Sequence, residues 1–180
     1  DMFAQAVADG KVKLSEIAGT FSDVASTAAQ YKIGINEIAA SYGMLTAKGL
    51  SAGEASTAMN RAIISLAAPN GAMDQLTAKS HKNYLAIAGK QGLVEALQQV
   101  RDDADKYGLN LYKIMGRQEA FKFLMNTTGQ NLGQYRGELD KVNNSTGALN
   151  RQYDERQKGL PYQLARLRAS PRLERLRPPA

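Results

Sequence analysis

The sequence predicts an all-α fold: a compact bundle of short antiparallel helices joined by Gly-centred turns and followed by a longer C-terminal helix. Apolar residues recur at helical spacing along most of the chain, and no segment shows the alternation of a strand. Hydrophobic residues make up 43% of the 180 residues, with no Trp and only four Phe, and many of them are Ala. That composition favours helices packed closely through small faces over a sheet sandwich. A three-residue pattern of Gly, a large apolar residue and Asn or Ser also repeats.

The repeated pattern predicts where consecutive helices end and begin. It occurs at Gly34-Ile35-Asn36, Gly49-Leu50-Ser51 and Gly108-Leu109-Asn110. In each case Gly can adopt the left-handed conformation that ends a helix, and the apolar residue folds back onto the last turn of that helix. Asn or Ser then caps the next helix. We therefore expect Gly34, Gly49 and Gly108 to be structural turns. The expected helices are at about 14–31, 36–48, 51–67, 72–88, 92–107 and 110–126, with Gly116 interrupting the last.

The first three helices have clear apolar stripes. The stripe of the first helix is Leu14, Ile17, Ala18, Phe21, Val24, Ala25 and Ala28. The second has Ile35, Ile38, Ala39, Tyr42 and Leu45, and the third has Ala52, Ala55, Met59, Ala62, Ile63 and Leu66. Ser51 and Glu54 form a capping box at the start of the third helix, and Pro69-Asn70-Gly71 ends it. We expect Ala55, Ala58 and Met59 to lie at a close helix–helix contact.

Residues 36–69 resemble the core of phage tail tape measure proteins. In that family a helix ending L-x-x-x-G-φ-S/K precedes a small-residue helix with A-G/S-T-A-φ-x-R and a closing L-x-x-P. The matching residues are Leu45, Gly49, Leu50, Ser51, Ala55, Ser56, Thr57, Ala58, Met59, Arg61, Leu66 and Pro69. A looser resemblance follows at Gly92, Leu93, Leu97, Ile114, Met115, Gly116, Ala120 and Leu124. It extends over about 12–155, and we expect the chain to be a piece of a longer protein.

The resemblance implies a structural segment of a bacteriophage or prophage tail tape measure protein, acting in tail assembly and tail-length determination. The partners it implies are tail tube and tail-tip proteins and tail assembly chaperones, with a homo-oligomer as a further option. It also implies a location in the virion tail after synthesis in the bacterial host cytoplasm. Some members carry peptidoglycan-cleaving domains, but nothing in this sequence resembles one.

Few residues of the chain suggest chemistry. His81 is the only His and lies between lysines in a solvated turn, and there is no Cys for a thiolate metal site. The acidic residues Asp102, Asp103 and Asp105 point in different directions on a helix and have cations beside them. The turn at 89–92 lacks the spacing of a phosphate loop. We expect no catalytic, cofactor-binding or metal site, and therefore no enzyme.

Residues 129–156 carry a seam of apolar residues spaced alternately by three and four. Its members are Leu132, Tyr135, Leu139, Val142, Thr146, Leu149 and Tyr153. One interpretation is a long helix that packs on its own domain. The other is a coiled-coil seam for self-association through Leu132, Tyr135, Leu139, Val142, Leu149 and Tyr153. The predicted organisation is a helical bundle at 1–126, this long amphipathic helix at 127–158 and a tail at 159–180.

The tail holds most of the net positive charge of the chain. The net charge is +6, and residues 159–180 contribute five Arg against one Glu together with four of the five Pro. Such a shift in composition indicates vector-derived sequence or a shifted reading frame. The alternative function is a helical nucleic-acid- or membrane-surface-binding module that uses this Arg-rich tail. We do not expect nucleic acid or membrane contact through 159–180.

Overall fold

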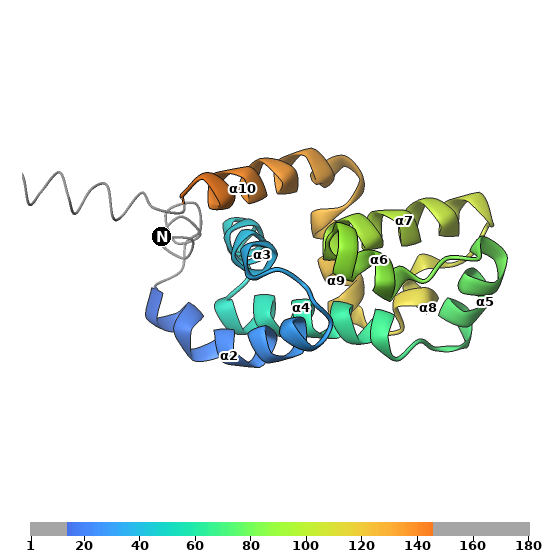
Figure 1. Ribbon diagram of the computed structural model, residues 1–180, viewed down its shortest axis with the longest axis horizontal. Helices are drawn as coiled ribbons and strands as arrows, with labels where there is room; N and C mark the ends of the chain where they lie inside the picture. Colours follow the sequence, from blue (N-terminus) through green and yellow to red (C-terminus); the bar gives the residue numbers. More distant parts are fainter. Residues whose placement is uncertain (1–13, 146–180) are drawn as a thin grey trace, which may run out of the picture.

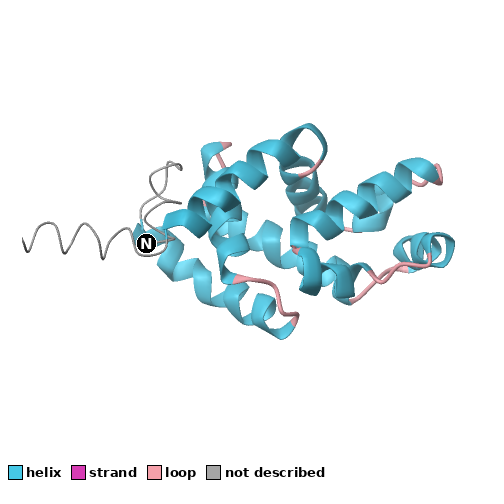
Figure 2. Cartoon of the chain, turned by 45° about the horizontal axis from the view of Figure 1, so that its top comes forward, coloured by secondary structure: helices cyan, strands magenta, loops and turns pink. Residues whose placement is uncertain are grey.

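The computed structural model of the chain describes residues 14–145. Within this range the fold is all-α and no strand occurs, which confirms the predicted class (Figures 1 and 2). The tail at 159–180 and the second half of the predicted seam lie outside the described residues, so those predictions stay predictions.

Nine α-helices and one 3₁₀ turn follow one another within the described range. They are α2 (Leu14–Gln30), α3 (Ile35–Ala47), α4 (Ala52–Ala67), α5 (Gly71–Ser80), α6 (Tyr84–Gln91), α7 (Leu93–Lys106), α8 (Leu111–Met115), α9 (Gln118–Thr127), the 3₁₀ turn η1 (Gly129–Asn131) and α10 (Leu132–Ser145).

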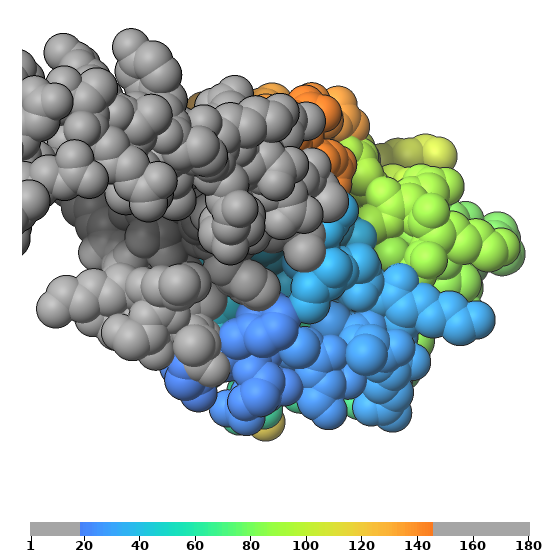
Figure 3. Space-filling model, turned by 60° about the vertical axis from the view of Figure 1, so that its left-hand side comes forward, coloured from blue at the N-terminus to red at the C-terminus, as the bar shows by residue number. Residues whose placement is uncertain are grey.

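Helix α4 lies at the centre of the arrangement. It contacts α2, α3, α6 and α9, while α6 and α7 pack on each other and α5 packs on α7 and α8 (Figure 1). From another side, α2, the start of α3 and the α6–α7 pair make up the coloured surface beside α10 (Figure 3). The core is continuous through all of these helices, and its largest fully buried side chains include Tyr42, Leu45, Met59 and Phe123.

The α3–α4 connection has the left-handed glycine that its sequence requires. Gly49 has a φ of +91°, and the Leu50 amide donates back to the Leu45 carbonyl oxygen at 3.1 Å. Ser51 then forms a capping box: its Oγ accepts from the Glu54 amide at 3.2 Å, and Glu54 Oε2 accepts from the Ser51 amide at 2.9 Å. One helix therefore ends and the next begins within four residues.

Replacing Gly49 with Val should lower the free energy of unfolding by more than about 1 kcal/mol, because a β-branched residue is forced into positive φ. No heavy atom lies within 4 Å of the position where a Cβ would be, so the backbone conformation alone sets the effect. Gly49→Asn, which tolerates this conformation better, is the control and should cost less. Thermal unfolding measures both, and an unchanged midpoint for Gly49→Val would contradict the prediction.

The turn before α3 differs from the predicted pattern. Gly34 has a φ of −67° and is the N-cap of α3, while the positive φ of +59° belongs to Lys32. Helix α3 begins at Ile35, so Asn36 lies inside it and does not cap it. The expected left-handed stop at Gly34 is therefore wrong, because the chain has already left α2 at Lys32. At the third repeat, Gly108 has a φ of +64° and Asn110 caps α8.

Two predicted helices are each two helices in the structure. The segment 72–88 is divided because His81 adopts the left-handed conformation with a φ of +56°, and Asn83 caps α6 by accepting from the Ala86 amide. The segment 110–126 is divided at Gly116, as predicted, where φ is +68°. Both divisions are local: a left-handed residue ends one helix, and the next helix begins within three residues.

Helix α10 packs on the bundle through its apolar seam. It begins at Leu132, later than the predicted 127, because Thr127 is the last residue of α9. Tyr135 and Val142 are each 2% exposed, and α10 lies along α3 (Figure 1).

Leu132 and Leu139 are partly buried against the same core. Within the described residues, these contacts favour the interpretation of a helix that packs on its own domain, and self-association stays a prediction. Leu149 and Tyr153 lie outside the described residues, so self-association through them is untested.

Candidate functional site

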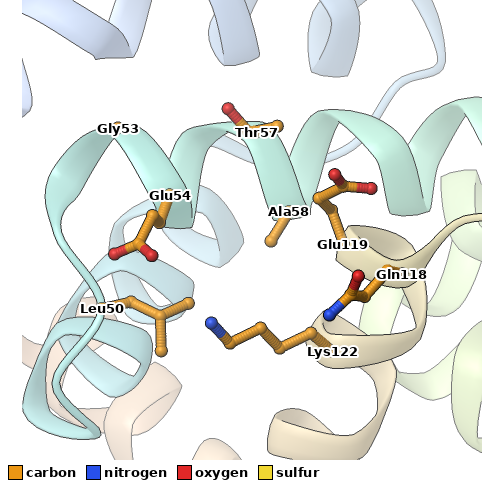
Figure 4. A pocket seen from close by; sticks show the side chains of 8 residues that line it. All are labelled: Leu50, Gly53, Glu54, Thr57, Ala58, Gln118, Glu119 and Lys122. Carbon is orange, nitrogen blue, oxygen red and sulfur yellow. The ribbon is translucent and has the colours of Figure 1, made fainter.

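The candidate site is a cleft between the start of α4 and α9. It measures about 420 Å³ and is lined by Leu50, Gly53, Glu54, Thr57, Ala58, Gln118, Glu119 and Lys122. Lys122 reaches from α9 toward Leu50 and Glu54, and Ala58 lies between the two helices (Figure 4). The α4 capping box holds the Glu54 side chain at the first turn, where it lines the cleft.

The electrostatics of this cleft follow from the capping box. The backbone amide and then the hydroxyl of Ser51 donate to Glu54, and both lower the pKa of its carboxyl group; the Lys122 charge lowers it further. A carboxylate held in this way is already ionised and partnered, so it is poorly suited to take up or release a proton near neutral pH.

The residues predicted for helix packing lie on α4, beside this cleft. Ala55 is fully buried, Ala58 is 1% exposed and Met59 is fully buried. They belong to α4, which contacts both α2 and α9. The small side chains of Ala55 and Ala58 allow close approach of neighbouring helices, and Ala58 also lines the cleft.

A second polar cluster, around Asp103, ties the α5–α6 connection to α7. Asp103 is 6% exposed, and its Oδ2 accepts from Tyr84 Oη at 2.8 Å and from Lys82 Nζ at 2.7 Å. The Tyr84 hydroxyl lies 2.9 Å from Ser80 Oγ, and burial raises the pKa of Tyr84. The buried carboxylate is therefore paired and hydrogen-bonded, the arrangement that a structural ion pair requires.

Glu37 caps a helix to which it does not belong. The first turn of α7 has no side-chain cap of its own, and Glu37 Oε2 on α3 accepts from the Leu93 amide at 2.6 Å. Burial raises the pKa of Glu37, and the negative charge of nearby Glu95 raises it further. The hydrogen bonds from the Leu93 and Gly34 amides oppose this rise. Arg136 on α10 binds Glu95 through two hydrogen bonds of 2.7 and 2.8 Å, so three helices meet at this junction.

The raised pKa of Glu37 makes stability depend on pH. The folded chain binds this proton more tightly than the unfolded chain does, so this group's contribution to stability falls as pH rises from the ordinary glutamate pKa, about 4.3, through the raised one. Glu37→Gln should remove that fall while its amide oxygen still accepts from Leu93. Urea unfolding of the parent chain and of Glu37→Gln at a series of acidic pH values measures this difference.

Glu138→Gln on α10 is the control for this prediction, because it changes the net charge equally. An identical pH dependence of unfolding in the two variants would contradict the assignment to Glu37.

Sequence reasoning missed both buried clusters. It assigns Asp103 to a solvated group with Asp102 and Asp105, since spacing on one helix does not reveal a partner in the α5–α6 connection. Glu37 gives no signal at all, because its partner amide is 56 positions away. Among residues 14–145, no group of three or more acidic or His side chains is placed to hold a metal ion. No helix in that range is long and apolar enough to span a bilayer.

The family described as phage-related minor tail protein matches residues 1–147, more than three quarters of the sequence. The chain belongs to this family. The chain has a structural role in the phage tail, and its location is the virion tail. No curated protein and no solved structure matches the chain. Membership of this family indicates that the chain interacts with other components of the tail.

Proposed function

We propose that this chain is a segment of a tail tape measure protein that acts in tail assembly and tail-length determination. The observation that carries the proposal is the central position of the α3–α4 hairpin. The residues that resemble the tape measure pattern, from Leu45 to Pro69, form the end of α3, the Gly49 turn and all of α4, and α4 packs on α2, α3, α6 and α9. Membership of the phage-related minor tail family supports the same role.

The physical basis of a molecular ruler is that chain length converts into tube length. A helix advances about 1.5 Å per residue, so the stretch 14–145 would span roughly 200 Å as one continuous helix. The turns at Lys32, Gly49 and Gly108 instead fold this stretch back on itself. We therefore assign the ruler property to the parent chain and a local assembly role to this segment, with Ala55, Ala58 and Met59 holding its helices together.

We propose tail tube proteins, tail-tip proteins and tail assembly chaperones as the partners, and a role without catalysis. The partnered state of Glu54 and Asp103 supports a non-enzymatic role, since both carboxylates are occupied by hydrogen bonds.

An in-frame deletion of the segment in the parent phage or prophage tests the function. Electron microscopy of the particles should show missing tails, as expected for an assembly contact. Tails shortened by roughly 200 Å would instead assign a ruler contribution to this segment and contradict its local role. Normal tails at normal yield would contradict the proposed function as a whole.

A further inference from the structure

A cleft of about 350 Å³ lies between the second half of α4, the N-cap of α5 and the turn from α8 to α9. It is separate from the cleft of Figure 4, with which it shares no lining residue. Arg61 of α4 and Arg117 at the start of α9 both line it, and Ile64 forms an apolar edge that is 39% exposed.

Hydrogen bonds fix the residues around this cleft. Ser65 Oγ lies 2.8 Å from the Arg61 carbonyl oxygen and 2.9 Å from that of Met115, which joins α4 to the end of α8. The Asn70 side chain caps α5 by accepting from the Ala72 and Met73 amides, at 2.9 and 3.0 Å.

The amide nitrogen of Asn70 also donates to the last carbonyl groups of α8, those of Lys113 at 3.0 Å and Ile114 at 3.2 Å. Gly116 must be glycine here, because its φ is +68° and a Cβ would lie 2.5 Å from Asn70 Nδ2. The cleft is therefore formed before any ligand arrives.

The two guanidinium groups have no partner among the described residues. Neither Arg61 nor Arg117 forms a hydrogen bond or ion pair there through its side chain, whereas Arg136 is held by Glu95. No acidic residue lines the cleft. Two unpaired cations beside one apolar edge attract an anion that also carries apolar groups.

The overall charge of the described chain distinguishes between two kinds of anionic partner. Residues 14–145 hold thirteen Lys and Arg against twelve Asp and Glu, so positive charge is not in general excess. Duplex DNA binding relies on many phosphate contacts over a basic surface. Two arginines that line one cleft instead suit a carboxylate, which a guanidinium group can bind through parallel hydrogen bonds.

We propose that this cleft binds an acidic peptide segment of a partner protein. One Asp or Glu carboxylate of the segment is held by Arg61 and Arg117, and an adjacent apolar side chain packs on Ile64. The inference goes beyond the proposed tape measure function and does not depend on it.

Titration of the full 180-residue chain with a short fluorescent peptide of alternating Glu and Leu tests the site, with the same peptide carrying Gln for Glu as its control. Fluorescence anisotropy should show binding of the Glu peptide that weakens at high salt. The double variant R61Q/R117Q should bind at least about tenfold more weakly. K113Q is the matched control, since Lys113 is a nearby exposed cation that does not line the cleft, and it should bind nearly as the parent does.

The NMR signals of the side-chain Nε–H groups of Arg61 and Arg117 give a second readout. This readout does not require the double variant to fold. Each signal is assigned by its disappearance in the single variant R61Q or R117Q, and both should shift when the Glu peptide is added to the parent chain. Equal peptide binding by the parent and R61Q/R117Q, or unshifted arginine signals, would overturn the proposal. Signals that move only with a DNA duplex, or with chain concentration alone, would also overturn it and assign the cleft to nucleic acid or to a second copy.

Discussion

Gly92→Ala should lower the free energy of unfolding by about 3 kcal/mol. Gly92 ends α6 and begins α7 at a φ of +109° and a ψ of 152°, a conformation that is almost restricted to glycine. A Cβ there would lie 2.9 Å from Glu37 Oε2, which cannot move away without losing its 2.6 Å hydrogen bond to the Leu93 amide. Backbone strain and loss of the α7 cap therefore occur together.

Gly137→Ala in α10 is the matched control for this prediction. It makes the same chemical change at an exposed helical position with nothing within 4 Å of the new Cβ, so it should stabilise the chain slightly. Urea unfolding followed by circular dichroism measures both variants. Equal stability of Gly92→Ala and Gly137→Ala would contradict the account of the α6–α7 junction.

Phe123→Ala should lower the free energy of unfolding by about 3–5 kcal/mol. Phe123 is fully buried on the face of α9 that packs into the core, and its removal leaves a cavity where α9 meets the rest of the bundle. Small domains have a total stability of about 5–15 kcal/mol, so this single change removes a large share of it.

The same substitution at Phe121 is the control, because that ring is only partly buried. Phe121 packs edge-on against Tyr112, with ring centroids 5.3 Å apart, and Tyr112 is itself 50% exposed. Phe121→Ala should therefore cost about 1–2 kcal/mol. Chemical unfolding of both variants gives the comparison. A larger loss of unfolding free energy for Phe121→Ala would contradict the assignment of the Phe123 face of α9 to the core.

Local sequence signals predicted much of this fold. The apolar stripes indicated where helices occur, and Gly49, Ser51 and Glu54 specified a turn whose geometry depends only on neighbouring residues. Failures occurred where a residue other than glycine took a positive φ. Lys32 and His81 both do so, and the apolar pattern around them does not indicate it.

The candidate cleft and the buried clusters are formed by residues that lie far apart in the sequence. A local sequence pattern could therefore not reveal them. Arg61 matches one position of a family-like pattern, but its place beside Arg117 requires α4 to meet the α8–α9 turn. Asp103 is one of three acids that share a helix, and only the fold of the α5–α6 connection places Lys82 and Tyr84 against it. The seam correctly predicted which face of α10 is apolar. It did not indicate that this face packs on α3.

The central claim of the account is that tail assembly requires this segment as a folded bundle, separately from the length of chain it contributes. Phages carrying Phe123→Ala or Phe121→Ala, imaged by electron microscopy at a temperature at which only the first variant unfolds the segment, test this most directly. The account predicts far fewer tails for Phe123→Ala, with the remaining tails of normal length, and normal yield for Phe121→Ala. Normal yield for both variants would contradict it.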